Sequence, residues 1–404
     1  MKNSRLRIIV SGMVAQCPVG GVAWDYLQYV IGLSELGHDV YYHEDTWCWP
    51  YDPVRNTASP DGSYSAQFLQ SFFARHAPAL IDRWHYNHLH ERSYGMSPQD
   101  FSDVAGSAEL FLNVSGVCAI PPELNDRCLK VFLDTDPGYN QINLIERFAW
   151  SENIDRWCEQ VAAHDVHFTY AECMGAEECT VPTAGFSWKT TRMPVVLRCW
   201  SHLSGVPARP QDSWTTVMTW NNFRGNLIHQ GVEYRGKGPE FEKFIDLPAR
   251  VNVPLEIAVG GQQVPQARLE AHGWKVTDGP RATLTAESYQ QFIRRSRGEI
   301  STAKNVYVAM HTGWFSCRSA CYLAAGRPAI LQDTGFSRQI PCGHGLLAFN
   351  TLDEATQMIE SVEANYARHA AAATQIARQC FDSNRVLSDL LDATFDSSTH
   401  DETA

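Results

Sequence analysis

The sequence predicts an α/β protein of two domains, and three observations lead to this prediction. The chain has 404 residues, whereas one domain typically takes about 150. A strand, a glycine-containing loop, a helix and another strand follow one another in residues 7–46, and the same order recurs in residues 306–331. Between them, Gly175–Pro194 has no regular pattern and is typical of an inter-domain connection.

The composition excludes several classes of protein. Hydrophobic residues make up 44% of the chain and charged residues 19%, which is enough to build packed cores. The net charge of −12 disfavours nucleic acid and anionic membranes as partners. No apolar run is long enough to span a bilayer, and the N-terminus is interrupted too early for a signal peptide, so a cytoplasmic protein is expected.

Metal binding is not expected either. The 12 cysteines form no CxxC pair, so buried free thiols are the expected state. His85, His88 and His90 could bind a metal ion, but with their aromatic neighbours they could equally form a partly exposed aromatic patch.

The first half reads as a parallel α/β unit. A helix over Val22–Leu36 carries apolar residues at helical spacing and follows a long loop, Gly12–Gly21. The predicted strands are Arg7–Ser11, residues 38–46, Leu110–Val114, Leu129–Leu133 and, as the last strand of this half, His164–Tyr170. Residues 46–105 are rich in aromatic side chains and would be either an insertion that lines an acceptor pocket or a packing insertion without function.

Candidate substrate-binding residues follow the strands of this half. Gly20 and Gly21 end the loop after the first strand, where ligands approach open α/β sheets. Asp134 and Asp136 follow another strand and could bind a sugar hydroxyl, act as a base, or cap the next helix. Asp25 is placed in the first turn of the helix, where it could act as a catalytic base or simply favour the helix dipole.

The second half is predicted to begin near residue 213. Its expected strands are Trp214–Trp220, Leu255–Gly260, Val306–Met310 and Ala329–Leu331, and its expected helices begin at Lys237, at Thr283 and at about Arg318. The turn His311–Ser316 would join the end of a strand to the start of a helix, which is a favourable place for phosphate. Ser316, Arg318 and Ser319 add hydroxyl groups and a fixed positive charge there.

Two stretches resemble the glycosyltransferases of the GT-B fold that use nucleotide sugars, in particular those of group 1. GGVAWDYLQYVIGLSELGHDVYYHEDT is similar to their first unit, and HTGWFSCRSACYLAAGRPAILQDTG is similar to their nucleotide-sugar signature. The resemblance implies two Rossmann-like domains that face a central cleft: an acceptor-side domain over 1–205 and a donor domain over 213–360. Residues 361–404 would be helices that pack back across both domains, followed by a polar tail.

The resemblance also implies a nucleotide-sugar donor as co-substrate, without a further cofactor or a metal. Its phosphate-contact positions fall on His311, Gly313 and Ser316, with Trp314 beside them, and its sugar-contact positions lie near Asp333 and Thr334. Asn221 and Lys237 could reach the diphosphate from neighbouring loops, although Lys237 could also be a solvated lysine at a helix start. Asp25 lies close to where relatives carry a catalytic histidine.

One position departs from the family pattern. Many relatives hold the ribose with a glutamate where this chain has Cys321, so that contact is either supplied from elsewhere, with Arg318 and Glu299 as candidates, or lost. The expected function is sugar transfer to an unknown acceptor, with a small or aromatic molecule favoured. The alternatives are a non-hydrolysing nucleotide-sugar epimerase of the same fold and a catalytically inactive binding or scaffold protein.

Overall fold

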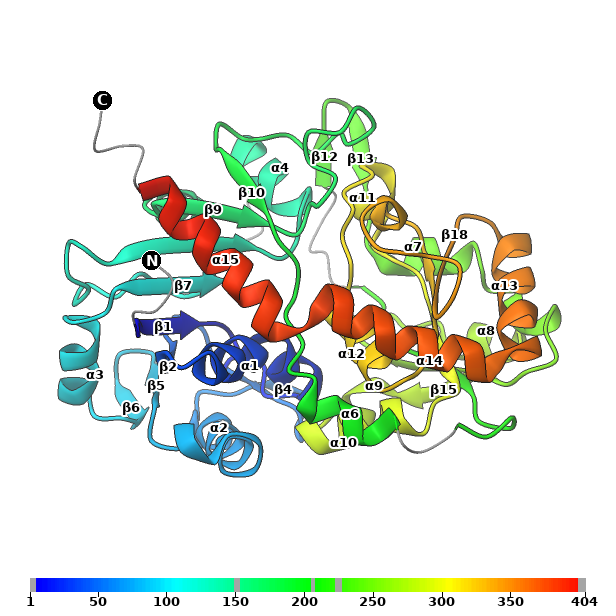
Figure 1. Ribbon diagram of the computed structural model, residues 1–404, viewed down its shortest axis with the longest axis horizontal. Helices are drawn as coiled ribbons and strands as arrows, with labels where there is room; N and C mark the ends of the chain where they lie inside the picture. The colour runs from blue at the N-terminus through cyan, green and yellow to red at the C-terminus, as the bar shows by residue number, and fades with distance from the viewer. Residues whose placement is uncertain (1–4, 149–152, 205–207, 222–226, 399–404) are drawn as a thin grey trace.

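The computed structural model describes residues 5–148, 153–204, 208–221 and 227–398. Two lobes are each built around one sheet (Figure 1). The first sheet has the strand order β10-β9-β8-β7-β1-β2-β5-β6, and only the edge strand β6 runs antiparallel. Its strands are β1 (Arg7–Ser11), β2 (Asp39–Glu44), β5 (Trp84–His88), β6 (Arg92–Gly95), β7 (Leu110–Val114), β8 (Leu129–Asp134), β9 (Val166–Thr169) and β10 (Trp188–Thr190).

The second sheet is entirely parallel and has the order β15-β14-β11-β16-β17-β18. Its strands are β11 (Trp214–Thr219), β14 (Leu255–Gly260), β15 (Lys275–Asp278), β16 (Gly298–Ser301), β17 (Ala329–Gln332) and β18 (Leu346–Phe349). Two small hairpins, β3–β4 (Tyr51–Asp52, Thr57–Ala58) and β12–β13 (Leu227–His229, Val232–Tyr234), lie outside the sheets. Two α/β lobes with parallel sheets confirm the predicted fold class.

Helices cover both sheets. In the first lobe these are α1 (Gly20–Glu35), α2 (Ser63–His76), α3 (Pro98–Ala105), α4 (Tyr139–Glu146) and α5 (Ile154–Ala162), followed by α6 (Arg198–Ser204). The second lobe has α7 (Lys237–Glu242), α8 (Gln266–Ala271), α9 (Gly279–Ala282), α10 (Ala286–Arg294), α11 (Asn305–Ala309), α12 (Cys317–Ala324) and α13 (Leu352–Ala364). In the part of the chain that the structure describes, no helix is both long and apolar enough to cross a membrane.

Two predictions of secondary structure were wrong. Val306–Met310, expected as a buried strand, is helix α11 and its C-cap, because its buried residues Val306, Tyr307 and Met310 form one helical face. His164–Tyr170 was expected to be the last strand of the first half. It contains β9, but a further strand of the same sheet follows it. The stretch expected to be irregular holds β10, a short and partly exposed strand beside β9.

The region from 46 to 105, expected to be an insertion, forms regular secondary structure that belongs to the first lobe. It supplies the strands β5 and β6 to the first sheet, together with the helices α2 and α3.

Helix α1 joins the two lobes. Trp24 is fully buried, packs edge-on against Trp200 at 5.1 Å between ring centroids, and donates from Nε1 to the Ala286 carbonyl of the second lobe. Gly20 donates to the Thr283 carbonyl, and a Cβ on Gly20 would lie 2.1 Å from the Thr285 carbonyl oxygen. One hydrophobic cluster therefore continues from the first sheet into the second lobe.

The C-terminal helices run across both lobes (Figure 1). Helix α14 (Tyr366–Ile376) packs on α12, and α15 (Ser383–Ser398) packs on α1. Between them a π-helical turn, Ala377–Phe381, lies beside the returning chain, where Val195 bonds to Phe381 and Ser383. The polar tail from 399 onward lies outside the described residues.

Candidate functional site

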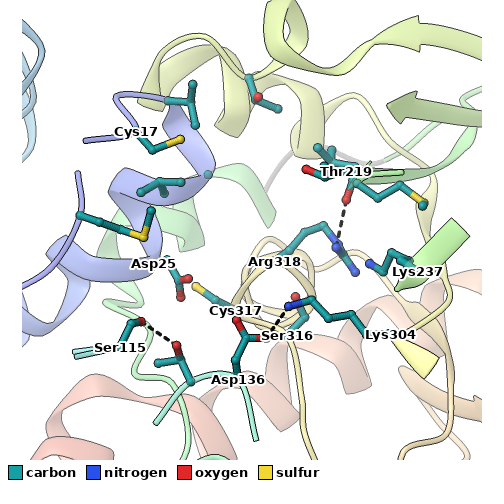
Figure 2. Close-up of a pocket in the computed structure, with 18 of the residues that line it drawn as sticks. Cys17, Asp25, Ser115, Asp136, Thr219, Lys237, Lys304, Ser316, Cys317 and Arg318 are labelled. Carbon is teal, nitrogen blue, oxygen red and sulfur yellow. Dashed lines mark hydrogen bonds and ion pairs between the residues drawn. The ribbon is translucent and has the colours of Figure 1, made fainter. Parts of the chain in front are cut away.

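A cleft of about 780 Å³ lies between the two lobes. The residues that line it follow the C-terminal ends of strands from both sheets, among them Ser115 after β7, Asp136 after β8 and Lys304 after β16 (Figure 2). Ligands of open parallel α/β sheets bind at this edge. The volume of the cleft is within the usual range of small-molecule sites, roughly 300–1,000 Å³.

Positive charge is concentrated on the side of the second lobe. Lys237, Lys304 and Arg318 all line the cleft, and Figure 2 shows their side chains converging on one region. Lys237 is 7% exposed, and among the described residues no hydrogen bond or ion pair to its ammonium group is found. Burial holds the pKa of Lys237 well below its usual value, and the Arg318 charge acts in the same direction. An anionic ligand beside Lys237 would raise its pKa again and so counteract both effects.

Arg318 is held from behind. Its Nε donates to Glu299, one terminal nitrogen donates to the Val217 carbonyl at 3.0 Å, and the other donates to Ser301 Oγ at 3.0 Å. Glu299 is fully buried. Three of the five guanidinium N–H groups are thus used for positioning, and two remain for a ligand.

The N-terminus of α12 opens into the same region. Ser316 is its N-cap residue, makes no side-chain capping bond, and lines the cleft with Cys317 and Arg318. The first backbone N–H groups of a helix have no partner within the helix and carry partial positive charge. Together with the three cations they concentrate positive charge at this end of the cleft, where an anionic group would be favoured.

Asp25 faces the cleft from the first lobe. It is the sixth residue of α1, so it does not lie in the first helical turn as predicted, and the helix dipole does not explain it. Burial raises the pKa of Asp25 to about 6; a hydrogen bond with Cys317 opposes this effect, and the Asp136 charge adds to it. A carboxyl group with such a pKa is suited to accept a proton near neutral pH.

Asp136 links the lobes at the bottom of the cleft. It forms an ion pair with Lys304 and accepts a hydrogen bond from the Tyr307 hydroxyl. The residue before it, Thr135, accepts at its carbonyl from Trp314 Nε1 at 3.1 Å. Trp314 also stacks on Tyr307, with 4.3 Å between ring centroids, and so forms part of the wall.

The structure brings seven of the predicted site residues into the cleft. They are Gly21, Asp25, Asp136, Lys237, Trp314, Ser316 and Arg318.

Other predicted residues have structural partners instead. Asp134 is fully buried and accepts from Asn140, Gln141 and Thr169, each at 2.7 Å. Gly20 packs on the Thr285 carbonyl and is not among the residues that line the cleft. Asn221 is exposed at the end of β11, immediately before residues outside the described ranges, and does not line the cleft.

Three residues of the predicted nucleotide-sugar signature do not face the cleft. His311 has φ of +47° and is exposed, and Gly313 has φ of +78° and donates to the Thr334 carbonyl at 2.8 Å. Asp333 accepts from the Gly335 N–H and the Ser337 hydroxyl, and so holds the next turn. None of these residues lines the cleft.

Thr334 and Ser319 lie beside a second, small cavity of about 20 Å³. The Thr334 hydroxyl donates to the Trp314 carbonyl at 2.6 Å.

Of the two candidates for the missing ribose contact, Arg318 reaches the cleft surface and Glu299 does not. Glu299 is buried behind Arg318, and Arg318 uses its Nε to bind it. Cys321 is fully buried in the core and lies 3.9 Å from Gln28 Nε2. The usual ribose position of this helix is therefore part of the packing between α12 and α1.

Sequence reasoning missed several lining residues. Lys304 and Tyr307 follow β16, Ser115 follows β7, and Trp157 lies on α5. Ser115 carried a usable signal, because it comes directly after the predicted strand Leu110–Val114. Lys304 and Trp157 carried none, since the strand before Lys304, GEIS, is not an apolar run.

The three histidines of the aromatic segment have separate partners. His85 lies 3.2 Å from His43 between ring nitrogens, His88 Nε2 contacts the Pro60 carbonyl, and His90 pairs with Asp45. Within the described ranges no group of three or more potential ligands could hold a metal ion.

Solved structures with the same architecture were found. HepE of Anabaena, solved with UDP and glucose, has a TM-score of 0.55 and 13% identity, over 96% of this chain and 100% of its own. An α-glucosyltransferase solved with UDP and a 13-mer DNA has a TM-score of 0.56 and 10% identity, over 97% and 100%. Sucrose-phosphate synthase of Thermosynechococcus elongatus has a TM-score of 0.51 and 11% identity, over 97% of this chain and 100% of its own.

These likenesses show the fold: the chain has the GT-B architecture of two Rossmann-like domains with a cleft between them. No family model matches the sequence, and no curated protein matches it.

Proposed function

We propose that this protein is a glycosyltransferase that moves a sugar from a nucleoside diphosphate donor to the hydroxyl group of a small or aromatic acceptor. One observation carries the proposal: Lys237, Lys304, Arg318 and the open end of α12 meet in the cleft opposite Asp25. This arrangement pairs a diphosphate site with a base across a space that a sugar can fill.

The donor diphosphate would bind Lys237, Arg318 and the backbone N–H groups after Ser316. Beside them, Gly260, Gly261 and Gly279 follow strands β14 and β15 and line the cleft without side chains. Such a surface lets a planar base approach the backbone closely. Two of the structures with the same fold were solved with UDP, so UDP-sugars are the first donors to test.

Asp25 would take the proton from the acceptor hydroxyl while that oxygen attacks the anomeric carbon. The bond between this carbon and the phosphate oxygen breaks, and its electrons stay on the leaving diphosphate. The Lys237 and Arg318 charges and the α12 dipole would stabilise the developing negative charge. We expect that transfer by this route inverts the configuration of the sugar and needs no metal.

The test measures release of the nucleoside diphosphate from UDP-, GDP- and dTDP-sugars, with and without acceptor extracts. We expect release with at least one donor, increased by acceptor. Formation of an isomeric nucleotide sugar without release would indicate an epimerase, and binding without either reaction would indicate a binding protein. No release with any donor contradicts the proposal.

Variants test the site itself. Lys237→Gln should weaken nucleoside diphosphate binding at least tenfold, because the buried ammonium group is lost, and Ser316→Ala should weaken it less. Lys243→Gln is the matched control, since Lys243 follows α7 but is 58% exposed and pairs with Glu240. Equal affinities of the Lys237 and Lys243 variants would remove Lys237 from the diphosphate site.

A further inference from the structure

The two walls of the cleft differ in charge. Among the described residues, the cations that line it are Lys237, Lys304 and Arg318, and all of these belong to the second lobe. Of the described residues that line it from the first lobe, none is a lysine, an arginine or a histidine. The charged groups on that wall are the carboxylates Asp25 and Asp136, and Asp136 is already paired with Lys304.

The wall of the first lobe is instead aromatic and apolar. Tyr51, Tyr139 and Trp157 line it and are half-buried, so part of each side chain remains open to a ligand. Val117 lines it too and is 36% exposed. The Tyr51 hydroxyl donates to Asn56 Oδ1 at 2.7 Å, which positions this ring at the wall. Flat aromatic faces stack favourably on flat apolar faces of a ligand.

Exposed apolar side chains lie in the same segment of chain as Tyr51. Trp47 is 48% exposed, Trp49 is 56% exposed and Val54 is 70% exposed. Trp47 is held in place, because it stacks on His90 with 3.4 Å between ring centroids. Single exposed apolar residues are ordinary, but three within eight residues, beside a ring that lines the cleft, favour a ligand with an apolar substituent.

We propose that the acceptor is an uncharged hydroxyl compound with a flat apolar face, such as an aryl glycoside, and that the wall of the first lobe excludes phosphorylated and carboxylated acceptors. An anion on that wall would meet the Asp25 carboxylate, while the donor diphosphate and Asp136 occupy the cations of the opposite wall. This inference rests on the proposed function, since it assigns the partner of the same reaction.

The test compares the binding of two matched probes, 4-nitrophenyl β-glucopyranoside and its 6-phosphate, to the whole protein by calorimetry. Both are measured with and without UDP, and UDP binding is measured separately. We expect the neutral probe to bind at least tenfold more tightly than the phosphorylated probe, and the difference to grow when UDP is present. Equal or tighter binding of the phosphorylated probe, or no binding of the neutral one, overturns the inference.

A charge placed on the wall provides the second measurement. Val117→Lys adds a cation to a partly exposed position, where the fold should tolerate it, and should reduce the preference for the neutral probe at least fivefold. Val232→Lys adds the same charge at a 50% exposed position of the β12–β13 hairpin, outside the cleft lining, and should leave the preference unchanged within twofold. An equal effect of both variants would contradict a role for this wall. Failure of UDP and the other nucleoside diphosphates to bind would instead contradict the proposed function.

Discussion

Asp136 and Lys304 form an ion pair across the bottom of the cleft, one from each lobe. Lys304 is one of the three cations that would face the proposed diphosphate, so its charge would be shared between Asp136 and the ligand. The pair would therefore connect the positions of the two lobes to the binding of the donor.

Asp136→Asn should strengthen nucleoside diphosphate binding about two- to fivefold at low salt, because Lys304 loses its competing carboxylate and partly exposed ion pairs are worth about 0.2–1 kcal/mol. The gain should shrink at high salt. Calorimetric titration with UDP measures it. Asp155→Asn is the control, since Asp155 forms an exposed pair with Arg147 away from the cleft. Unchanged or weaker binding in the Asp136 variant would show that the pair does not compete with the ligand.

Asp25→Asn should keep donor binding within about threefold and reduce turnover by 10²–10⁴, the usual contribution of a general base. The amide has nearly the same size, so the fold should remain. Donor affinity, thermal midpoint and initial rate are measured together. Normal turnover in this variant would remove Asp25 from the mechanism.

The pH profile tests the same residue without a substitution. Since burial and the Asp136 charge raise the pKa of Asp25 to about 6, kcat/KM should fall about tenfold per pH unit below pH 6 and level off above it. In Asp136→Asn the break should move to lower pH, because one of the causes that raise this pKa is gone. A break that stays in place would assign it to another group.

Glu44→Gln should flatten the dependence of stability on pH. Glu44 is fully buried and accepts from the Ala15 and Gln16 N–H groups of the loop before α1, and burial raises its pKa to about 7. Between the unfolded value of about 4.3 and the folded value, the folded protein holds a proton that the unfolded chain has released. Stability should therefore fall by roughly 3 kcal/mol as pH rises from about 4 to 7 and then level off.

Thermal midpoints at pH 5, 6, 7 and 8 measure this effect. The variant should lose part of the slope between pH 5 and 7, whatever its absolute midpoint. Equal slopes in the two proteins would show that Glu44 is ionised throughout.

Gly313→Ala should destabilise the protein by about 2 kcal/mol or more. A Cβ there would lie 2.7 Å from the Cys173 amide nitrogen, and φ is +78°. Gly231→Ala is matched for φ, at +79°, but has open space around its Cβ, so it should cost only about 1 kcal/mol. Donor affinity of the folded Gly313 variant should stay unchanged. A large loss of donor affinity without a loss of stability would show that Gly313 contributes to phosphate binding after all.

The sequence was sufficient for strands made of long apolar runs bounded by glycine or polar residues, such as Leu110–Val114, because these runs have no competing interpretation. It was insufficient for Val306–Met310, where five apolar residues fit a strand and a helical turn equally well. It also missed β10, whose three residues are partly exposed at a sheet edge, and the short strands β5, β6, β15, β16 and β18.

Site residues were predicted correctly where their position at the start of a helix or after the end of a strand determines that they face the cleft. Ser316 and Arg318 open a helix, and Asp136 follows a strand, so their approximate place was readable. His311 and Gly313 were not, because the left-handed φ values of these residues turn the chain away from the cleft, and a motif does not reveal backbone direction. Asp134 and Asp136 look alike in sequence, yet neighbouring side chains bury the first and leave the second at the cleft.

The packing of α1 between the lobes has a practical consequence. Trp24 donates to the Ala286 carbonyl, and Gly20 lies against the Thr285 carbonyl with no room for a side chain. Separating the chain near residue 210 would uncover these surfaces on both fragments. We therefore expect that neither half can be produced as a stable independent module, and that heating the intact protein gives a single cooperative transition.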